Sequence, residues 1–371
     1  MDFALTEDHK AVQALARRII NDWATDDRVK QLSEDPGWYD SELWRELATA
    51  SLLGVALREE FGGAGFGMAE LAALCEEAGR CVAPLPVVST LVLGALPIQE
   101  FGSTYQKRIL TDVAAGQALL TAGLAELGHV DPARPATTAK VDGDRWAIDG
   151  VKVCVADADR ARFVLVPART NGEAIGIFLV EPSSAGVSLE REITTNGEPQ
   201  FTMTLSGARA EALGDPARGA AIVRWIERRA TIALSALQLG ISDAALERTA
   251  RYGGERKQFE KPIGSFQAFA MRSADAFIDV EAIRSTLYQA IWAVNEERDA
   301  DRAVEVAKWW ACRAGHRVAH SVQHLHGGIG ADIEYPIHRF FLWAKQTEYA
   351  MGGASVHLAR LGALLADEAK P

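Results

Sequence analysis

The chain has 371 residues, of which 48% are apolar and 24% charged, a composition typical of a globular protein large enough for two or three domains. Its 39 basic and 50 acidic residues give a net charge of -11, which offers no general attraction for nucleic acid or an anionic membrane. The starting segment MDFALTEDHK lacks the features of a secretion signal, and VVSTLVLGALPI is too short to cross a membrane, so we expect a cytoplasmic protein. No CxxC pair occurs among the cysteines, which predicts reduced thiols and no metal site: Cys75, Cys81, Cys154 and Cys312.

The first and last parts of the sequence have helical periodicity. From Phe3 to about Asp112, apolar residues such as Leu43 and Leu47 recur at helical spacing. After Pro216 the same period returns and continues almost to the end of the chain. One long amphipathic helix is predicted there by residues spaced three and four apart: Val280, Ile283, Leu287, Ile291 and Val294.

Between these helical parts, from about Gly116 to Ala210, the pattern changes to short strands. The runs KVCV, RFVLVPA and IGIFLVEP are rich in β-branched and aromatic residues, and Asp142-Gly143 predicts a hairpin turn. The sequence therefore predicts an α+β, mostly α protein. We expect three domains: an N-terminal helical domain at 1–115, a middle β domain at 116–212 and a C-terminal helical bundle at 213–371.

Three segments resemble one known family. ARYGGERKQFEKPIGSFQAFAMRSAD, residues 250–275, resembles the C-terminal signature of the flavin-dependent acyl-CoA dehydrogenases, which usually have ERxQFGxPIxxFQ. EEFGGAG at 59–65 is similar to the N-terminal loop of that family, and HLHGGIG at 324–330 is similar to its second C-terminal motif. The segments occur in family order, and the resemblance covers essentially the whole chain. It implies the acyl-CoA dehydrogenase fold with a C-terminal four-helix bundle, usually assembled as a tetramer.

Two features of these motifs suit a phosphate-bearing cofactor. Arg256 offers a planar fork of donors, and Gly327-Gly328 lets a backbone approach a ligand with no Cβ in the way. The alternative is that Arg256 is a solvated helix arginine and that the glycines only end a helix. Their occurrence together in family order favours contact with the cofactor.

In the family these segments reach across a subunit interface to FAD that is bound mainly by the neighbouring subunit. The resemblance implies eight cofactor-binding positions in this chain: Arg256, Gln258, Phe259, Ile263, Phe266, His324, Gly327 and Gly328. His324 replaces the usual glutamine, and Glu260 replaces the usual glycine. A carboxylate at position 260 is unfavourable near a pyrophosphate unless its side chain turns away.

The residue that the family uses as catalytic base is missing. Members remove a proton α to the thioester carbonyl while hydride leaves the β carbon for the flavin, and this needs a carboxylate. The usual base is the glutamate of a YEG segment, and aligning forward from Ala344-Lys345 places Met351 there, whose thioether cannot accept a proton. A minority of members carry the base just before an arginine on the first long C-terminal helix, where this chain has Ala230 and Thr231.

Glu227 is the one nearby candidate for a replacement base. Glu227-Arg228 reproduces the Glu-Arg pair, but three residues upstream of that register, which is about 4.5 Å of helix rise. We therefore favour a solvated or interfacial charge over a catalytic role for Glu227. The basic residues Arg224, Arg228 and Arg229 are more simply a charged helix face or a subunit contact than a site for the phosphates of CoA.

The middle domain lacks the groups that usually hold the flavin ring. Catalytic members hold the isoalloxazine with the backbone and hydroxyls of a Thr-Glu and Gly-Ser-Asp run and of a Trp-Ile-Thr run. The corresponding stretches here are TAGLAELGHVD at 121–131 and KVCVADA at 152–158, and neither preserves those hydroxyls. The resemblance thus implies that this chain keeps the C-terminal motifs that contact the FAD of a neighbouring subunit. It lacks the middle-domain groups that would hold the ring of its own FAD.

This division, together with the run HRFFLWAKQTEYAMGGAS, resembles the non-catalytic subunit of the α2β2 acyl-CoA dehydrogenases that actinobacteria use on steroid side-chain CoA thioesters. It implies a catalytic homologue as partner, FAD shared across the interface, and an acyl-CoA substrate bound mainly by the partner. One alternative is a self-sufficient homotetrameric dehydrogenase or oxidase-like flavoenzyme with a non-standard base. Another is a flavin-free scaffold.

Overall fold

Two compact units make up the chain, which is described by a computed structural model for residues 5–129, 131–170, 174–296, 298 and 300–368. The helical unit comprises residues 1–36, 68–84 and 231–371, and the sheet unit comprises 37–67 and 85–230. Helix α7 (Gly219–Glu255) begins in the sheet unit and ends in the helical unit. Each unit thus combines segments that are far apart in sequence, and the division into three consecutive domains stays a prediction.

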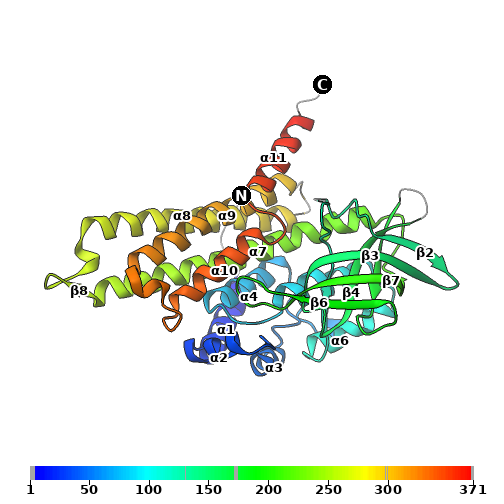
Figure 1. Cartoon of the computed structure of the whole chain (residues 1–371), viewed down its shortest axis with the longest axis horizontal. Coiled ribbons are helices and arrows are strands. Elements are labelled where there is room, and N and C mark those ends of the chain that lie inside the picture. The colour runs from blue at the N-terminus through cyan, green and yellow to red at the C-terminus, as the bar shows by residue number, and fades with distance from the viewer. Residues whose placement is uncertain (1–4, 130, 171–173, 297, 299, 369–371) are drawn as a thin grey trace. The chain divides into compact units, whose positions relative to one another are not determined.

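The helical unit is built around α9. Helix α9 packs against α8, α10 and α11, and α1 packs against α4 (Figure 1). The long helix expected around Val280 is present as α8, with Val280, Ile283 and Leu287 buried. No helix among the described residues is long and apolar enough to cross a membrane. Besides the end of α7, the main helices of this unit are α1 (Glu7–Trp23), α2 (Asp26–Glu34), α4 (Met68–Arg80), α8 (Gln267–Asn295), α9 (Asp301–His326), α10 (Ile337–Tyr349) and α11 (Ala354–Glu368).

The sheet unit contains seven paired strands in the order β1-β4-β2-β3-β7-β5, with β6 paired to β7. Because β5 also pairs with β4, the strands from β4 round to β5 close on themselves. The hairpin expected at Asp142-Gly143 joins β2 to β3, with Asp142 opposite Arg145. The strands are β1 (Leu119–Ala122), β2 (Thr138–Asp142), β3 (Arg145–Ala156), β4 (Ala161–Arg169), β5 (Ile175–Val180), β6 (Val187–Glu192) and β7 (Gln200–Ala212).

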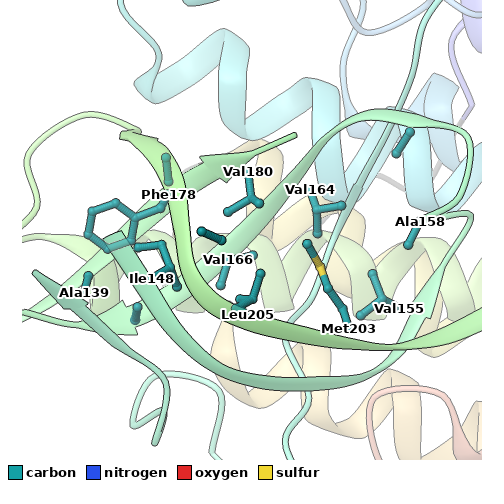
Figure 2. Packing of buried hydrophobic residues seen from close by; sticks show 14 of the residues in the cluster. Ala139, Ile148, Val155, Ala158, Val164, Val166, Phe178, Val180, Met203 and Leu205 are labelled. Atoms are coloured by element: carbon teal, nitrogen blue, oxygen red, sulfur yellow. The ribbon is translucent and has the colours of Figure 1, made fainter. Parts of the chain in front are cut away.

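Short helices accompany these strands. They are α3 (Ser41–Thr49), the 3-10 turns η1 (Glu59–Phe61) and η3 (Gln106–Arg108), the π-helix η2 (Val87–Ala95), α5 (Leu96–Phe101) and α6 (Ile109–Ala114). Figure 2 shows the apolar side chains that the strands enclose, among them Val164, Phe178 and Met203, all fully buried. Side chains alternate between the two faces of a strand, so alternate residues along much of β4, β5 and β7 contribute to this core.

Helices α4 and α7 approach each other so closely that glycine is required at their crossing. A Cβ on Gly240 would lie 1.9 Å from the carbonyl oxygen of Glu76, and one on Gly79 would lie 2.2 Å from that of Leu237. Both obstacles are backbone atoms, which cannot swing aside as a side chain can. The crossing holds the N-terminal helices of the unit against the C-terminal ones.

Replacing Gly240 by alanine is expected to destabilise the helical unit by about 1 to 3 kcal/mol or more, because the helices must move apart to admit one methyl group. Gly254→Ala is the matched control on the same helix, since a Cβ there meets nothing within 4 Å. That control should be neutral or stabilise by up to about 1 kcal/mol. Urea unfolding of the two variants measures the difference, and equal midpoints would contradict the close packing.

Candidate functional site

A short hairpin follows α7 and carries the first of the two C-terminal motifs. Its strands are β8 (Lys257–Gln258) and β9 (Lys261–Pro262), and the N–H of Ile263 closes it by donating to the carbonyl of Arg256 at 2.8 Å. Figure 1 shows it projecting from the ends of α7 and α8. The turn η4 (Ile263–Ser265) then leads into α8.

The tip of this hairpin is a two-residue turn with left-handed backbone at both positions. Phe259 has φ 51° and Glu260 has φ 63°, values that such turns require and that glycine or asparagine usually supplies. A side chain in this conformation costs about 1 to 2 kcal/mol. Phe259 is 87% exposed and meets Phe266 edge-on, with ring centroids 6.4 Å apart. The tip therefore directs aromatic surface away from its own chain.

Ring stacking brings the second motif to the base of the hairpin. Tyr252, in the last turns of α7, stacks on His326, the last residue of α9, with centroids 4.5 Å apart and ring planes 22° apart. Burial lowers the pKa of His326, whose Nδ1 bonds the carbonyl of Val322 at 2.9 Å. A Cβ on Gly253 would lie 2.5 Å from the ring of Phe269, so α7 and α8 are closely packed at the base of the hairpin.

The segment after α9 is open to solvent. Gly327 has φ 65° and ψ -144°, a combination that favours glycine, and a Cβ on Gly327 or Gly328 would meet nothing within 4 Å. Both glycines are exposed, as are Arg256 and Gln258. Among the described residues the Arg256 guanidinium has no hydrogen bond or ion pair. His324 is exposed and is held by Arg272, whose Nη1 lies 2.5 Å from its Nδ1.

These observations fit a phosphate-bearing group that is bound against one end of the helical unit. The two predicted motifs lie together there, through the Tyr252–His326 stack and the Arg272–His324 contact. No carboxylate of the described residues binds Arg256 or His324, and a Cβ on Gly327 or Gly328 would meet nothing within 4 Å. Arg272 and Tyr252 were not predicted, because only their contacts across the helices place them beside the two motifs.

Met351, at the position of the usual base, occupies the turn between α10 and α11. It is half-buried and has φ 59°. Two side chains of α9 bind the end of α10 beneath it: Lys308 Nζ donates to the Thr347 carbonyl at 2.7 Å, and Cys312 Sγ donates to that of Glu348 at 3.1 Å. Burial lowers the pKa of Lys308 and raises the pKa of Cys312. A cation at a helix C-terminus is favourable, so the turn is firmly held.

Two carboxylates near this turn are each engaged by basic side chains. Glu348 pairs with Lys345 at 2.9 Å and with His316 at 3.1 Å. Glu305 bonds Nδ1 of the fully buried His357 at 2.6 Å. These contacts account for both carboxylates without a ligand. Sequence patterns gave no sign of these pairs, since each joins residues from two helices or adjacent turns.

Glu227, the candidate for a replacement base, lies in the sheet unit and is 6% exposed. Arg224 binds it at 2.6 Å and also binds Asp131 at 2.7 Å, so one guanidinium bridges two carboxylates. Arg229 lies over the ring of Trp225, 3.6 Å from its centroid, and burial lowers the pKa of Arg229 to about 10. These contacts account for both arginines without a ligand.

In the stretches that would hold a flavin ring, the central interaction is a buried ion pair. Lys152 Nζ, fully buried, lies 2.6 Å from Oε1 of Glu126. The same carboxylate accepts hydrogen bonds from the Thr137 hydroxyl at 2.6 Å and from the N–H groups of Ala136 and Thr137. The hydroxyl of Thr121, the single one in these stretches, is fully buried and without a partner. Val130 lies outside the described residues.

Two family models match the chain. One, described as acyl-CoA dehydrogenase, C-terminal domain, matches residues 218–365, and the other, acyl-CoA dehydrogenase, N-terminal domain, matches residues 6–117. The chain belongs to the acyl-CoA dehydrogenase family. The expected fold, with N-terminal helices, a central sheet and C-terminal helices, is confirmed, and members of the family bind FAD.

Several acyl-CoA dehydrogenases are similar to this chain over most or all of its length. Acyl-CoA dehydrogenase FadE27 of Mycobacterium tuberculosis is 37% identical over 99% of either protein, and FadE28 of the same organism is 34% identical over 86% of this chain and 91% of the relative. A structure of the Tcur3481-Tcur3483 steroid ACAD is 45% identical, with a TM-score of 0.92 over 98% of this chain and 99% of that one. The ChsE4-ChsE5 complex from Mycobacterium tuberculosis contains a chain 36% identical, with a TM-score of 0.93 over 100% of both.

Replacing Glu126 by glutamine is expected to destabilise the sheet unit by about 3 to 5 kcal/mol, because the Lys152 ammonium is left buried without a counter-charge. Burial opposes ionisation of Glu126, but Lys152 and the hydrogen bonds lower its pKa to about 2. The carboxylate therefore stabilises the fold above its unfolded pKa of about 4.3, and this contribution disappears as the pH falls toward 2.

Urea unfolding at neutral pH and along the acid limb measures both effects of Glu126→Gln. Glu190→Gln, an exposed change on β6 of the same sheet, serves as the control and should alter stability by less than about 0.5 kcal/mol. If both variants unfold at the same urea concentration, the buried pair does not stabilise the sheet unit.

Proposed function

We propose that this chain is the non-catalytic subunit of a heteromeric FAD-dependent acyl-CoA dehydrogenase. A catalytic homologue supplies the base and the pocket for the flavin ring and binds most of the acyl-CoA. This chain adds the hairpin and the glycine segment to the other end of the same cofactor. We further propose an α2β2 assembly in the cytoplasm that desaturates the α,β bond of an acyl-CoA thioester, with a steroid side-chain CoA as the substrate class.

The observation that carries this proposal is the contrast between the two halves of a dehydrogenase site within one chain. Most of the groups for contact with a neighbour's cofactor are exposed, and Arg256, the charged member, has no ion pair among the described residues. The groups for independent chemistry are absent or engaged: Met351 stands at the base position, and Glu227 is bound by Arg224. A subunit that completes a partner's site needs the first set only.

The similar structures support the choice of partner and substrate. Two of them are named as pairs of different chains, ChsE4-ChsE5 and Tcur3481-Tcur3483, and the second is called a steroid ACAD. Their likeness covers the whole chain at 36% and 45% identity. A mixed complex with another acyl-CoA dehydrogenase is accordingly favoured over a homotetramer.

Binding and orientation are the roles we assign to this chain's residues. When bound, FAD supplies the hydride acceptor for the desaturation. Arg256 is suited to donate charge-assisted hydrogen bonds to a pyrophosphate, and the backbone at Gly327 and Gly328 is open to close approach. Phe259 and Phe266 offer apolar surface beside these donors. None of these residues moves a proton, so proton transfer falls to the partner.

The isolated chain is expected to bind clearly less than one FAD per chain and to reach a full site only together with its partner. Absorbance of the flavin band per chain, before and after mixing with the catalytic homologue and removal of free FAD, gives this number. A yellow homo-oligomer with one FAD per chain that bleaches with acyl-CoA would instead establish the self-sufficient enzyme.

The variant Met351→Glu is expected to remain inactive in the isolated chain. A positioned base contributes about 10²- to 10⁴-fold in rate, but a base has no use without a hydride acceptor held beside the β carbon, and the hydroxyls that hold the flavin ring are missing here. The measurement is turnover of an acyl-CoA with added FAD and an artificial electron acceptor, with Met351→Gln as the uncharged control. Clear turnover by the glutamate variant alone would show that this chain contains a complete site lacking one residue.

A further inference from the structure

We propose that Arg272 is a positioning residue that fixes His324 as the tautomer protonated on Nε2, so that His324 acts as a hydrogen-bond donor toward the cofactor. The observation is the contact from α8 to α9 in which Arg272 Nη1 lies 2.5 Å from His324 Nδ1. Within the described residues this is the one hydrogen bond of the Arg272 guanidinium. The inference rests on the proposed function, because the group that receives the donor is FAD.

The chemistry of arginine determines the direction of this hydrogen bond. A guanidinium carries only donors and stays charged, so His324 Nδ1 must be the acceptor and carries no proton. A neutral imidazole has one proton, which is then on Nε2. Without Arg272 the ring would exchange between two tautomers, and only one of them presents Nε2–H.

A second histidine of the same helix end is held in the opposite state. His326 Nδ1 lies 2.9 Å from the carbonyl oxygen of Val322, which can only accept, so the proton of His326 is on Nδ1. His326 is 4% exposed and stacked on Tyr252, whereas His324 is exposed. The buried histidine therefore serves packing. The exposed one keeps its Nε2–H for a ligand.

The groups gathered here define the ligand atom that His324 would meet. Arg256 and the Nε2–H of His324 are donors, and the backbone at Gly327 and Gly328 is unshielded. The side-chain donors of such a set suit oxygen acceptors, as in a pyrophosphate or its sugar. A glutamine at this position would present an amide N–H₂ without help, whereas a histidine needs its tautomer set. Arg272 is the residue that sets it.

A double-mutant cycle in the mixed complex tests this role. FAD dissociation constants are measured for the complex with unchanged chain and with Arg272→Met, His324→Gln and both changes together. Arg272→Met alone should weaken FAD binding roughly five- to tenfold, the range for one hydrogen bond. In the His324→Gln background the same change should have no effect, because an amide has no tautomer to fix. An equal loss in both backgrounds, or no loss in either, would overturn the proposal.

Two controls separate this inference from the proposed function. Arg251→Met removes an exposed arginine of α7 whose ion pair is with Glu247 on the same helix, and it should leave FAD affinity unchanged. Arg256→Ala should weaken FAD binding roughly tenfold to hundredfold if this chain contacts the cofactor at all. If Arg256→Ala and every Arg272 variant retain FAD equally well, the proposed contact with FAD is wrong and the ligand role of His324 is overturned with it.

The tautomer itself can be measured without any cofactor. Nitrogen NMR of the isolated chain, labelled at histidine and assigned by His324→Gln, should show His324 with an unprotonated Nδ1, and Arg272→Met should shift it toward a mixture. His326 should keep the opposite pattern in both proteins. If the His324 signals are the same in the unchanged chain and in Arg272→Met, the positioning role is overturned even if FAD affinity changes.

Discussion

The stack of Tyr252 on His326 joins the two segments from which the candidate cofactor site is built. One ring comes from the end of α7 and the other from the end of α9, separated in sequence by the hairpin, α8 and the rest of α9. Offset contact between such rings gains about 0.5 to 1.5 kcal/mol beyond the burial of their surface. Its larger effect is geometric, because it fixes where the hairpin at Phe259 and the glycines at Gly327 stand relative to each other.

Polar groups around Met351 bind the backbone of the turn. Lys308 and Cys312 bind the carbonyls that end α10, and Glu348 is held between Lys345 and His316. In the sheet unit, Lys152 and Glu126 likewise satisfy each other. Buried polar groups are generally paired, because burying one without a partner costs free energy. In both regions the described charged groups hold segments of the chain in place.

Sequence patterns predicted the elements whose signal is local. The spacing of Val280, Ile283 and Leu287 predicted α8, and Asp142-Gly143 predicted the hairpin between β2 and β3. The family resemblance supplied the candidate positions. What could not be predicted is pairing between helices: Arg272 with His324, or Lys308 with a carbonyl of α10, since periodicity reports which face is apolar and not which neighbour it meets. For the same reason the grouping of α1, α2 and α4 with the C-terminal helices was not visible.

The exposed tip of the hairpin affects how the separate chain behaves in solution. Phe259, at 87% exposure, stands out on a turn whose left-handed backbone keeps its ring away from the body of the protein. If the proposed partner covers this ring, the separate chain leaves Phe259, beside the partly exposed Phe266, open to contact with other apolar surfaces. For the proposed mixed complex this favours making both subunits together, and the net charge of -11 opposes self-association of a chain made in excess.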